Sequence, residues 1–282
     1  MKTRLLATFF FVSTFLNAQP RWQQQADYQM EVSLDPQKHL IKGREFITYT
    51  NNSPDTLSKV YFHLYWNAFQ PGSMMDVRSR SLPDPDRRVQ DRISKLSEKE
   101  IGYQKIVSFI QNGRQATTRV IGTILEVQLP SLLLPHSKTT FEVTFESQVP
   151  IQIRRSGRDN REGIAYSMTQ WYPKIAEYDH QGWHPYQYVA REFHGVWGNY
   201  DVTINIPPEF VVAGTGKLQN ALEVGHGYED VGAKVSRPKG NLKWHFVAPN
   251  VIDFAWAADP QYKHERNRVP GGPELHFFYQ PG

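Results

Sequence analysis

The sequence of 282 residues contains no cysteine, which excludes a disulfide framework and any thiolate metal site. A bound metal would therefore need histidine and carboxylate ligands. The G-x-S-x-G nucleophile motif and the glycine-rich loops that bind dinucleotides or phosphates are also missing, so the residues alone do not specify an enzyme. The hydrophobic fraction of 39% suffices for a substantial core, in one all-β unit or in two smaller domains.

Long apolar runs are confined to the first 18 residues. Lys2 and Arg4 precede an apolar segment that runs to Leu16, and Ala18 is suited to cleavage, so we expect a signal peptide over residues 1–18. The protein would then be exported, to the periplasm or outside the cell, without a membrane span. Removing Lys2 and Arg4 leaves 30 basic and 28 acidic residues, a net charge of +2. This near-equal number of basic and acidic residues does not indicate a nucleic-acid partner.

Strand patterns dominate the rest of the chain. Apolar and polar residues alternate, with turn signals about every ten residues, as in half-buried strands of antiparallel sheets. The expected strands cover residues 28–33, 40–50, 60–66, 103–110, 121–129, 139–149, 198–206, 210–213, 242–247, 251–258 and 275–278. The sequence predicts a mostly β, antiparallel, sandwich-like fold with few short helices, one of them within 93–101, and a long polar loop over 70–91.

The stretch from Gln170 to Tyr188 concentrates aromatic rings, histidines and chain-breaking residues. Pro173, Gly182 and Pro185 exclude a regular helix and disfavour a central strand. We expect a fixed, aromatic-rich loop, the kind of segment that carries function when a rigid scaffold holds it. Composition supports equally well an aromatic corner that only covers the end of a sheet.

Two histidine motifs resemble metal sites without completing one. His180 and His184 have the spacing of two ligands on a helix, but the stretch is not helical, and Asp179 is the one further ligand nearby. A structural pair is the favoured interpretation. Residues 264–268, His-Glu-Arg-Asn-Arg, begin like the zinc motif HExxH, but Arg268 replaces the second histidine. We interpret this segment as a surface loop and expect no metal ligand in this chain.

Five short segments, taken in order, resemble a known family. They are TYTNNSPDTL (48–57), FHLYWNAF (62–69), QWYPK (170–174), VVAGTG (211–216) and DFAWA (253–257). Together they are similar to the N-terminal domain of exported bacterial members of the aminopeptidase N family of zinc metallopeptidases (peptidase family M1, gluzincins). The resemblance implies that residues 19–282 form a saddle-shaped, mostly antiparallel β domain, which in the family precedes a thermolysin-like catalytic domain.

The same resemblance implies a role for the Gln170 loop. In the family, the N-terminal domain contributes an amide, and often a carboxylate two residues later, to the pocket around the substrate's N-terminal residue. Gln170 resembles that amide, with Trp171 and Tyr172 shaping the pocket wall, although Tyr172 stands where the carboxylate would be. The family's zinc and its HExxH helix belong to the catalytic domain, and neither that motif nor the third-ligand glutamate is found in this sequence. We therefore expect a catalytically incomplete chain that binds no zinc and meets peptide substrates through a downstream domain.

Two other interpretations stay open. The chain could be a secreted β-sandwich binding module for glycans or proteins, which would bind through exposed aromatic rings of the Trp171–Tyr188 loop, Trp183 among them. It could also be an inactive relative of the peptidases, kept as a scaffold. The sequence does not decide the substrate preference or the oligomeric state.

Overall fold

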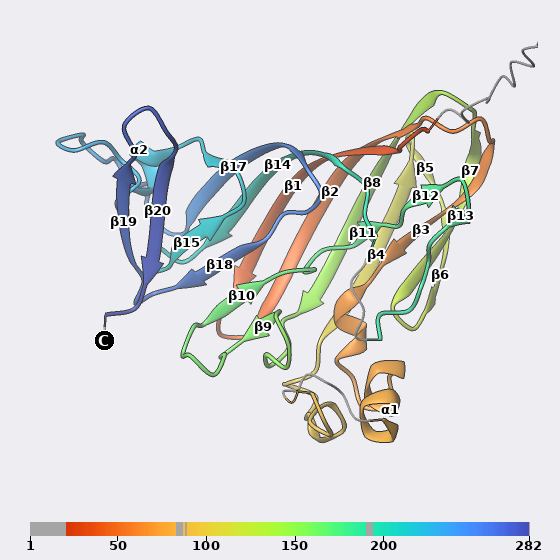
Figure 1. Cartoon of the computed structure of the whole chain (residues 1–282), viewed down its shortest axis with the longest axis horizontal. Coiled ribbons are helices and arrows are strands. Elements are labelled where there is room, and N and C mark those ends of the chain that lie inside the picture. The colour runs from red at the N-terminus through yellow and green to blue at the C-terminus, as the bar shows by residue number, and fades with distance from the viewer. Residues whose placement is uncertain (1–20, 83–86, 88, 190–193, 282) are drawn as a thin grey trace, which may run out of the picture.

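The computed structural model describes residues 21–82, 87, 89–189 and 194–281, so the expected signal peptide lies outside the described residues. Strands dominate and helices are few and short, which confirms the predicted mostly β, antiparallel fold class. Figure 1 shows a long, curved sheet that runs across the molecule, with shorter strands lying over one of its faces.

The large sheet has eight strands, and its long central strands alternate buried and exposed side chains. In spatial order they are β16 (Lys217–Leu218), β17 (Leu242–Val251), β14 (Gly198–Ile206), β1 (Gln25–Asp35), β2 (Leu40–Asn51), β8 (Ser137–Gln148), β4 (Tyr103–Gln111) and β5 (Arg114–Gln115). The pair of β1 and β14 is parallel, with Tyr28 opposite Tyr200, whereas the other neighbouring strands of this sheet are antiparallel. A parallel pair needs a long crossover connection, and here most of the chain lies between its two strands.

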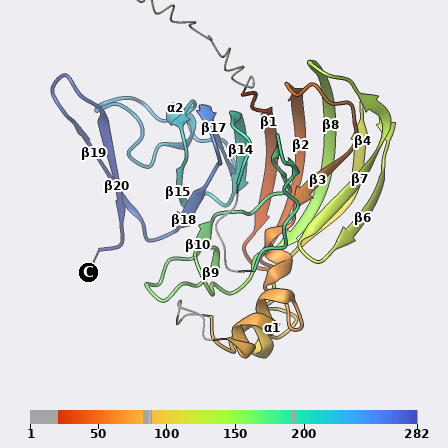
Figure 2. The ribbon, with the colours of Figure 1, turned by 45° about the vertical axis from the view of Figure 1, so that its right-hand side comes forward.

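Two four-stranded sheets cover the inner face of the large one. The first contains β15 (Val211–Gly214), β18 (Trp256–Asp259), β10 (Tyr166–Met168) and β9 (Gly157–Arg158), and the second β11 (Lys174–Ile175), β3 (Leu57–His63), β7 (Ile124–Leu133) and β6 (Thr117–Ile121). The ring centroid of Phe62 lies 5.2 Å from that of Phe109 and 6.2 Å from that of Phe141, so β3 packs directly on β4 and β8. Figure 2 shows β3, β7 and β6 as this second layer.

Two hairpins and four short helices complete the described chain. They are β12 (Tyr178–Asp179) with β13 (Gly182–Trp183), β19 (Lys263–Arg268) with β20 (Glu274–Tyr279), the α-helices α1 (Met74–Ser81) and α2 (Ala221–Val224), and the 3₁₀ helices η1 (Tyr65–Ala68) and η2 (Ile93–Lys95). Within the described ranges, no helix has the length and apolar character needed to cross a membrane.

Helix α1 lies inside the segment 70–91 that was predicted to be a polar loop. The Ser73 hydroxyl accepts the Asp76 backbone N–H at 3.1 Å, and the Asp76 carboxylate accepts the Gly72 N–H at 2.8 Å. This arrangement is close to a capping box, and Arg80 pairs with Asp76 one turn later, at 3.1 Å. The Ser-x-x-Asp spacing is thus the sequence signal that indicates this helix. The polar, proline-containing composition of the segment led to the prediction of a loop instead.

Three further predictions need correction. The helix within 93–101 is only the single turn η2, because the Ser97 hydroxyl and N–H both bond the Glu100 carboxylate and turn the chain. The strand over 60–66 ends three residues early, where η1 begins. Residues 264–268 form part of strand β19 and not a loop, because the Pro-Gly-Gly-Pro segment that follows connects them to β20 in a hairpin.

Glu45 places a carboxyl group inside the core, on the buried face of β2. Its side chain has no exposed surface, and neither carboxylate oxygen has a hydrogen-bond partner among the described residues. Burial raises the pKa of Glu45 well above its ordinary value, so the folded state holds the neutral acid. A polar group buried without a partner costs about 1–3 kcal/mol.

The substitution Glu45→Met should raise the free energy of unfolding by about 1–3 kcal/mol at neutral pH, since methionine has a similar shape and no unpaired oxygen. The gain should increase as the pH rises above 4.5, because the unfolded chain then loses the Glu45 proton that the folded chain retains. Urea unfolding at several pH values measures both effects. Glu31→Met, on the exposed face of β1, is the control; a loss of stability in Glu45→Met at every pH would contradict this account.

His63 is a second buried titratable group, at the end of β3. Its ring stacks on Tyr65 with centroids 4.9 Å apart, and its Nδ1 has no hydrogen-bond partner among the described residues. Burial, assisted by the positive charge of Lys174, lowers the pKa of His63 to about 3.

His63 should therefore make the protein less stable as the pH falls from 6.5 towards 3, because the unfolded histidine takes up a proton that the folded one does not. One fully shifted group contributes about 1.4 kcal/mol per pH unit to this slope. His63→Phe keeps a ring beside Tyr65 and should remove the contribution in unfolding experiments. His136→Asn, at an exposed position with a φ of 51° that asparagine tolerates, should leave the slope unchanged. Equal slopes in wild type and His63→Phe would refute the assignment.

Candidate functional site

Gln170 lies between β10 and β11 and combines burial with an unusual backbone. Its φ of 57° is left-handed, a conformation that residues other than glycine seldom adopt, and the residue is only 2% exposed. Its carbonyl oxygen accepts a hydrogen bond from the Gln104 side chain at 3.5 Å, but no described residue bonds its side-chain amide. Buried amides normally have partners, and backbone outliers concentrate at functional positions. The amide of Gln170 is thus able to bond an external group.

Trp171 and Tyr172 are fully buried and hold this segment against the sheets. The Trp171 indole donates to the Phe254 carbonyl at 2.9 Å. The Tyr172 hydroxyl donates to the Asp253 carboxylate at 2.7 Å and lies 3.0 Å from the Tyr200 hydroxyl. That these two residues shape a substrate pocket stays a prediction; in this chain both side chains are buried.

Lys174 fixes the other end of the same loop. Its ammonium group is buried, donates to the Ile252 carbonyl and lies 3.5 Å from the Asp253 carboxylate. Burial lowers the pKa of Lys174, and the neighbouring charge of Asp253 partly offsets that effect. Asp253 therefore interacts with two residues of the loop: it pairs with the Lys174 ammonium and accepts a hydrogen bond from Tyr172.

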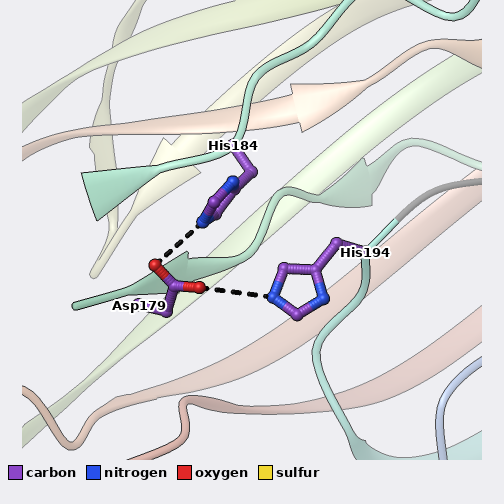
Figure 3. A group of neighbouring side chains, drawn as sticks. All are labelled: Asp179, His184 and His194. Carbon is purple, nitrogen blue, oxygen red and sulfur yellow. Dashed lines mark ion pairs between the residues drawn. The ribbon is translucent and has the colours of Figure 1, made fainter. Parts of the chain in front are cut away.

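Beyond this loop, the β12–β13 hairpin brings one carboxylate between two histidines. Asp179 Oδ1 lies 2.8 Å from His184 Nε2, and Asp179 Oδ2 lies 3.5 Å from His194 Nε2. Figure 3 shows the two rings approaching the carboxylate from different segments of the chain. His180, which the sequence pairs with His184, is instead exposed and 4.0 Å from Asp179. His194 is ten residues away from His184 in the sequence and had no local motif that could have indicated it.

A cavity with a volume of about 890 Å³ opens beside this cluster. Asp179, His180, His194 and Glu177 contribute to its wall, together with Trp197. Burial, reinforced by the negative charge of Asp179, raises the pKa of Glu177 to about 7. The cavity is thus polar at one end and large enough for a small ligand.

The remaining rings of the aromatic stretch pack against their neighbours. Trp183 lies 5.1 Å from Tyr178, 5.6 Å from Tyr61 and 6.4 Å from Tyr49, measured between ring centroids. Tyr186 is the one tyrosine or tryptophan of residues 170–188 that is largely exposed. Trp183 is half-buried among its three tyrosine neighbours. The alternative interpretation, a binding module for glycans or proteins that uses exposed rings of this loop, stays a prediction.

The residues that begin like HExxH do not fit a catalytic zinc ion. His264 stands on strand β19, where its Nε2 lies 2.9 Å from His276 Nδ1 on β20. The zinc motif instead requires a helix, which places two histidines one turn apart on one face. Arg268 offers no metal ligand in place of the second histidine. No step of zinc catalysis is therefore assigned to this segment.

Comparisons with solved structures find M1 zinc metallopeptidases among the similar folds. The chain is similar to a point mutant of an M1 zinc metallopeptidase from Deinococcus radiodurans bound to a Tyr-Ser-Ala substrate, with 13% identity, a TM-score of 0.52, and coverage of 92% of this chain and 48% of that one. Structures of a two-domain M1 zinc metallopeptidase mutant bound to L-tryptophan and to L-arginine give 12% and 14% identity, with TM-scores of 0.51 and 0.50. The matches cover 91% and 92% of this chain, and 47% and 48% of those two structures, respectively.

These similarities show a shared fold, at an identity too low to show more. The chain spans about half the length of the structures that it matches, which is consistent with the predicted N-terminal domain of an M1 metallopeptidase. No protein-family model and no curated protein matches the sequence.

Asp253→Asn should lower the free energy of unfolding by about 3 kcal/mol, because it leaves the buried Lys174 ammonium without its counter-charge. Asparagine still offers Tyr172 an acceptor, so the change isolates the charge. The double variant Lys174→Met with Asp253→Asn should recover much of the loss, as measured by urea unfolding. Asp201→Asn, in the more exposed pair with His245, should have little effect. A double variant no more stable than Asp253→Asn would show that the unpaired charge is not the cause.

Proposed function

We propose that this chain is the N-terminal substrate-pocket and scaffold domain of an exported zinc aminopeptidase of family M1. The shared fold, over nearly all of this chain and about half of each neighbour, supports a role as one of two domains. Two of those neighbours are bound to single amino acids and one to a Tyr-Ser-Ala substrate, which supports a peptide as the substrate of the parent enzyme. Export is inferred from the signal-peptide pattern of residues 1–18.

The observation that carries this proposal is the side-chain amide of Gln170. It has no partner among the described residues, and the backbone of Gln170 is left-handed. The next two residues, Trp171 and Tyr172, are fixed by their hydrogen bonds to Phe254 and Asp253. In the proposed pocket, the amide oxygen accepts a hydrogen bond from the ammonium group of the substrate's N-terminal residue. Tyr172 carries no carboxylate, and its own hydroxyl is bonded to Asp253. Recognition by this loop therefore depends on Gln170.

The two domains of the proposed parent enzyme would divide the labour between them. A zinc ion in the parent enzyme would activate water as a Lewis acid, with a glutamate as the base. The HExxH helix, which this sequence lacks, would supply that glutamate and hold the zinc ion. This chain would orient the peptide's amino end and present a rigid wall to the reacting bond. By itself it would hydrolyse no peptide.

In the enzyme that contains both domains, Gln170→Ala should lower kcat/KM for aminoacyl substrates by about tenfold to a hundredfold. A hydrogen bond to a charged group contributes about 1.5–3 kcal/mol, which corresponds to that range. The melting temperature should fall only by the packing lost at this buried position, because the Gln170 amide has no hydrogen-bond partner to lose within the described structure.

Gln181→Ala is the matched control, since Gln181 is exposed on the β12–β13 hairpin of the same stretch. It should retain the wild-type kcat/KM. Wild-type values for Gln170→Ala across several amino-terminal residues would refute the role of Gln170. Peptide hydrolysis by the purified chain alone would refute the proposed division of labour.

A further inference from the structure

The cluster at the β12–β13 hairpin has the composition of a metal site. One oxygen of Asp179 and one ring nitrogen each from His184 and His194 lie within 4.8 Å of one another. Two imidazoles with one carboxylate are a ligand set that zinc uses when it keeps further positions open for other ligands. Within the described residues, this group is the one where three such side chains converge so closely.

The distances are near those that a tetrahedral ion needs. Two ligand atoms at about 2.0–2.1 Å from a tetrahedral zinc ion are about 3.4 Å apart. The observed separations of 2.8 Å for His184 Nε2 and 3.5 Å for His194 Nε2, each from an Asp179 oxygen, lie on either side of this value. These separations are to different oxygens of Asp179, and one ion would need one atom from each residue; such a set lies within 4.8 Å, so the side chains must move closer together around the ion.

His184 provides a second, independent indication. Its Nε2 is buried, lies 2.8 Å from Asp179 Oδ1, and makes no contact that meets hydrogen-bond geometry among the described residues. A buried ring nitrogen without a partner is costly in a purely structural histidine. The same lone pair is satisfied when the nitrogen ligates a metal ion.

The backbone around the cluster holds the ligands in place. Asp179 Oδ1 also accepts the Gln181 N–H at 2.8 Å, and the His184 N–H donates to the Glu177 carbonyl at 2.9 Å. An antiparallel bridge between Ala176 and Gly195 brings the residue next to His194 beside the same hairpin. Metal sites are tight when such supporting bonds fix the ligands before the ion arrives.

From this geometry we propose that Asp179, His184 and His194 bind a divalent transition-metal ion of the zinc type. This proposal does not depend on the proposed aminopeptidase function. Imidazole ligands favour Zn²⁺, Co²⁺ or Ni²⁺ over Mg²⁺ and Ca²⁺. Because Asp179 and His194 line the 890 Å³ cavity, the open coordination positions of the ion face that cavity. An anionic or carbonyl group of a ligand in the cavity could complete the coordination.

The test is zinc binding by the purified chain, measured by calorimetry and by metal analysis after dialysis, with any affinity tag removed. His264 and His276 are first replaced by glutamine, because their adjacent rings on β19 and β20 could bind zinc adventitiously. We expect one equivalent of Zn²⁺, displaced by Co²⁺ with visible d–d absorption, and no saturable binding of Mg²⁺ or Ca²⁺. The melting temperature should rise with zinc, because the ion binds only the folded ligand set.

His194→Ala should weaken zinc binding at least about tenfold, and its exposed side chain makes a folding defect improbable as the cause. His184→Ala should have the same effect, with circular dichroism to check that it folds. His180→Ala is the matched control: this side chain is 73% exposed on the same hairpin and should leave the affinity within twofold. Stoichiometry well below one, or equal affinity of His194→Ala and its parent, would overturn the proposal. Because no peptide hydrolysis is measured, this outcome is independent of the test of Gln170.

Discussion

The stack of Tyr28 on Tyr200 is the contact on which the candidate sites depend. The two rings face each other across the parallel pair β1–β14, with centroids 4.8 Å apart and planes within 9° of parallel. The Tyr28 hydroxyl accepts the Ile175 N–H at 3.1 Å, and the Tyr200 hydroxyl contacts that of Tyr172. Burial raises the pKa of both tyrosines above the ordinary value, so both hydroxyl groups stay neutral. The first and last strands of a long crossover thus anchor the loop that carries Gln170.

The anchored loop supports two chemically different features in succession. At its start, Gln170 presents an amide that no residue in the described part of the chain bonds. A few residues later the chain turns through the β12–β13 hairpin, where Trp183 packs between Tyr49 and Tyr61 and places Asp179 opposite two histidines. The aromatic rings of the stretch therefore mainly hold its backbone in place by packing. The polar side chains between them are the groups left available for binding.

The fold itself decides less about function than the side chains do. A shared fold at 12–14% identity establishes a scaffold, and the same scaffold can carry different activities. The assignment of a peptidase pocket depends on Gln170, and the assignment of a metal site on the buried nitrogen of His184. Each is a local arrangement of a few groups, and each is testable without the other.

The sequence by itself determined the fold class, because apolar and polar residues alternate with period two in the segments that form β1, β2 and β8. It also singled out the 170–188 stretch, since proline and glycine restrict the backbone locally. Tertiary structure alone decided the rest. It joined His194 to Asp179 through a bridge at Gly195, it buried Trp171 and Tyr172, and it left the Gln170 amide without a partner among the described residues. The physical reason is that contacts between distant segments depend on how sheets pack, whereas a sequence pattern records only what each residue prefers beside its neighbours.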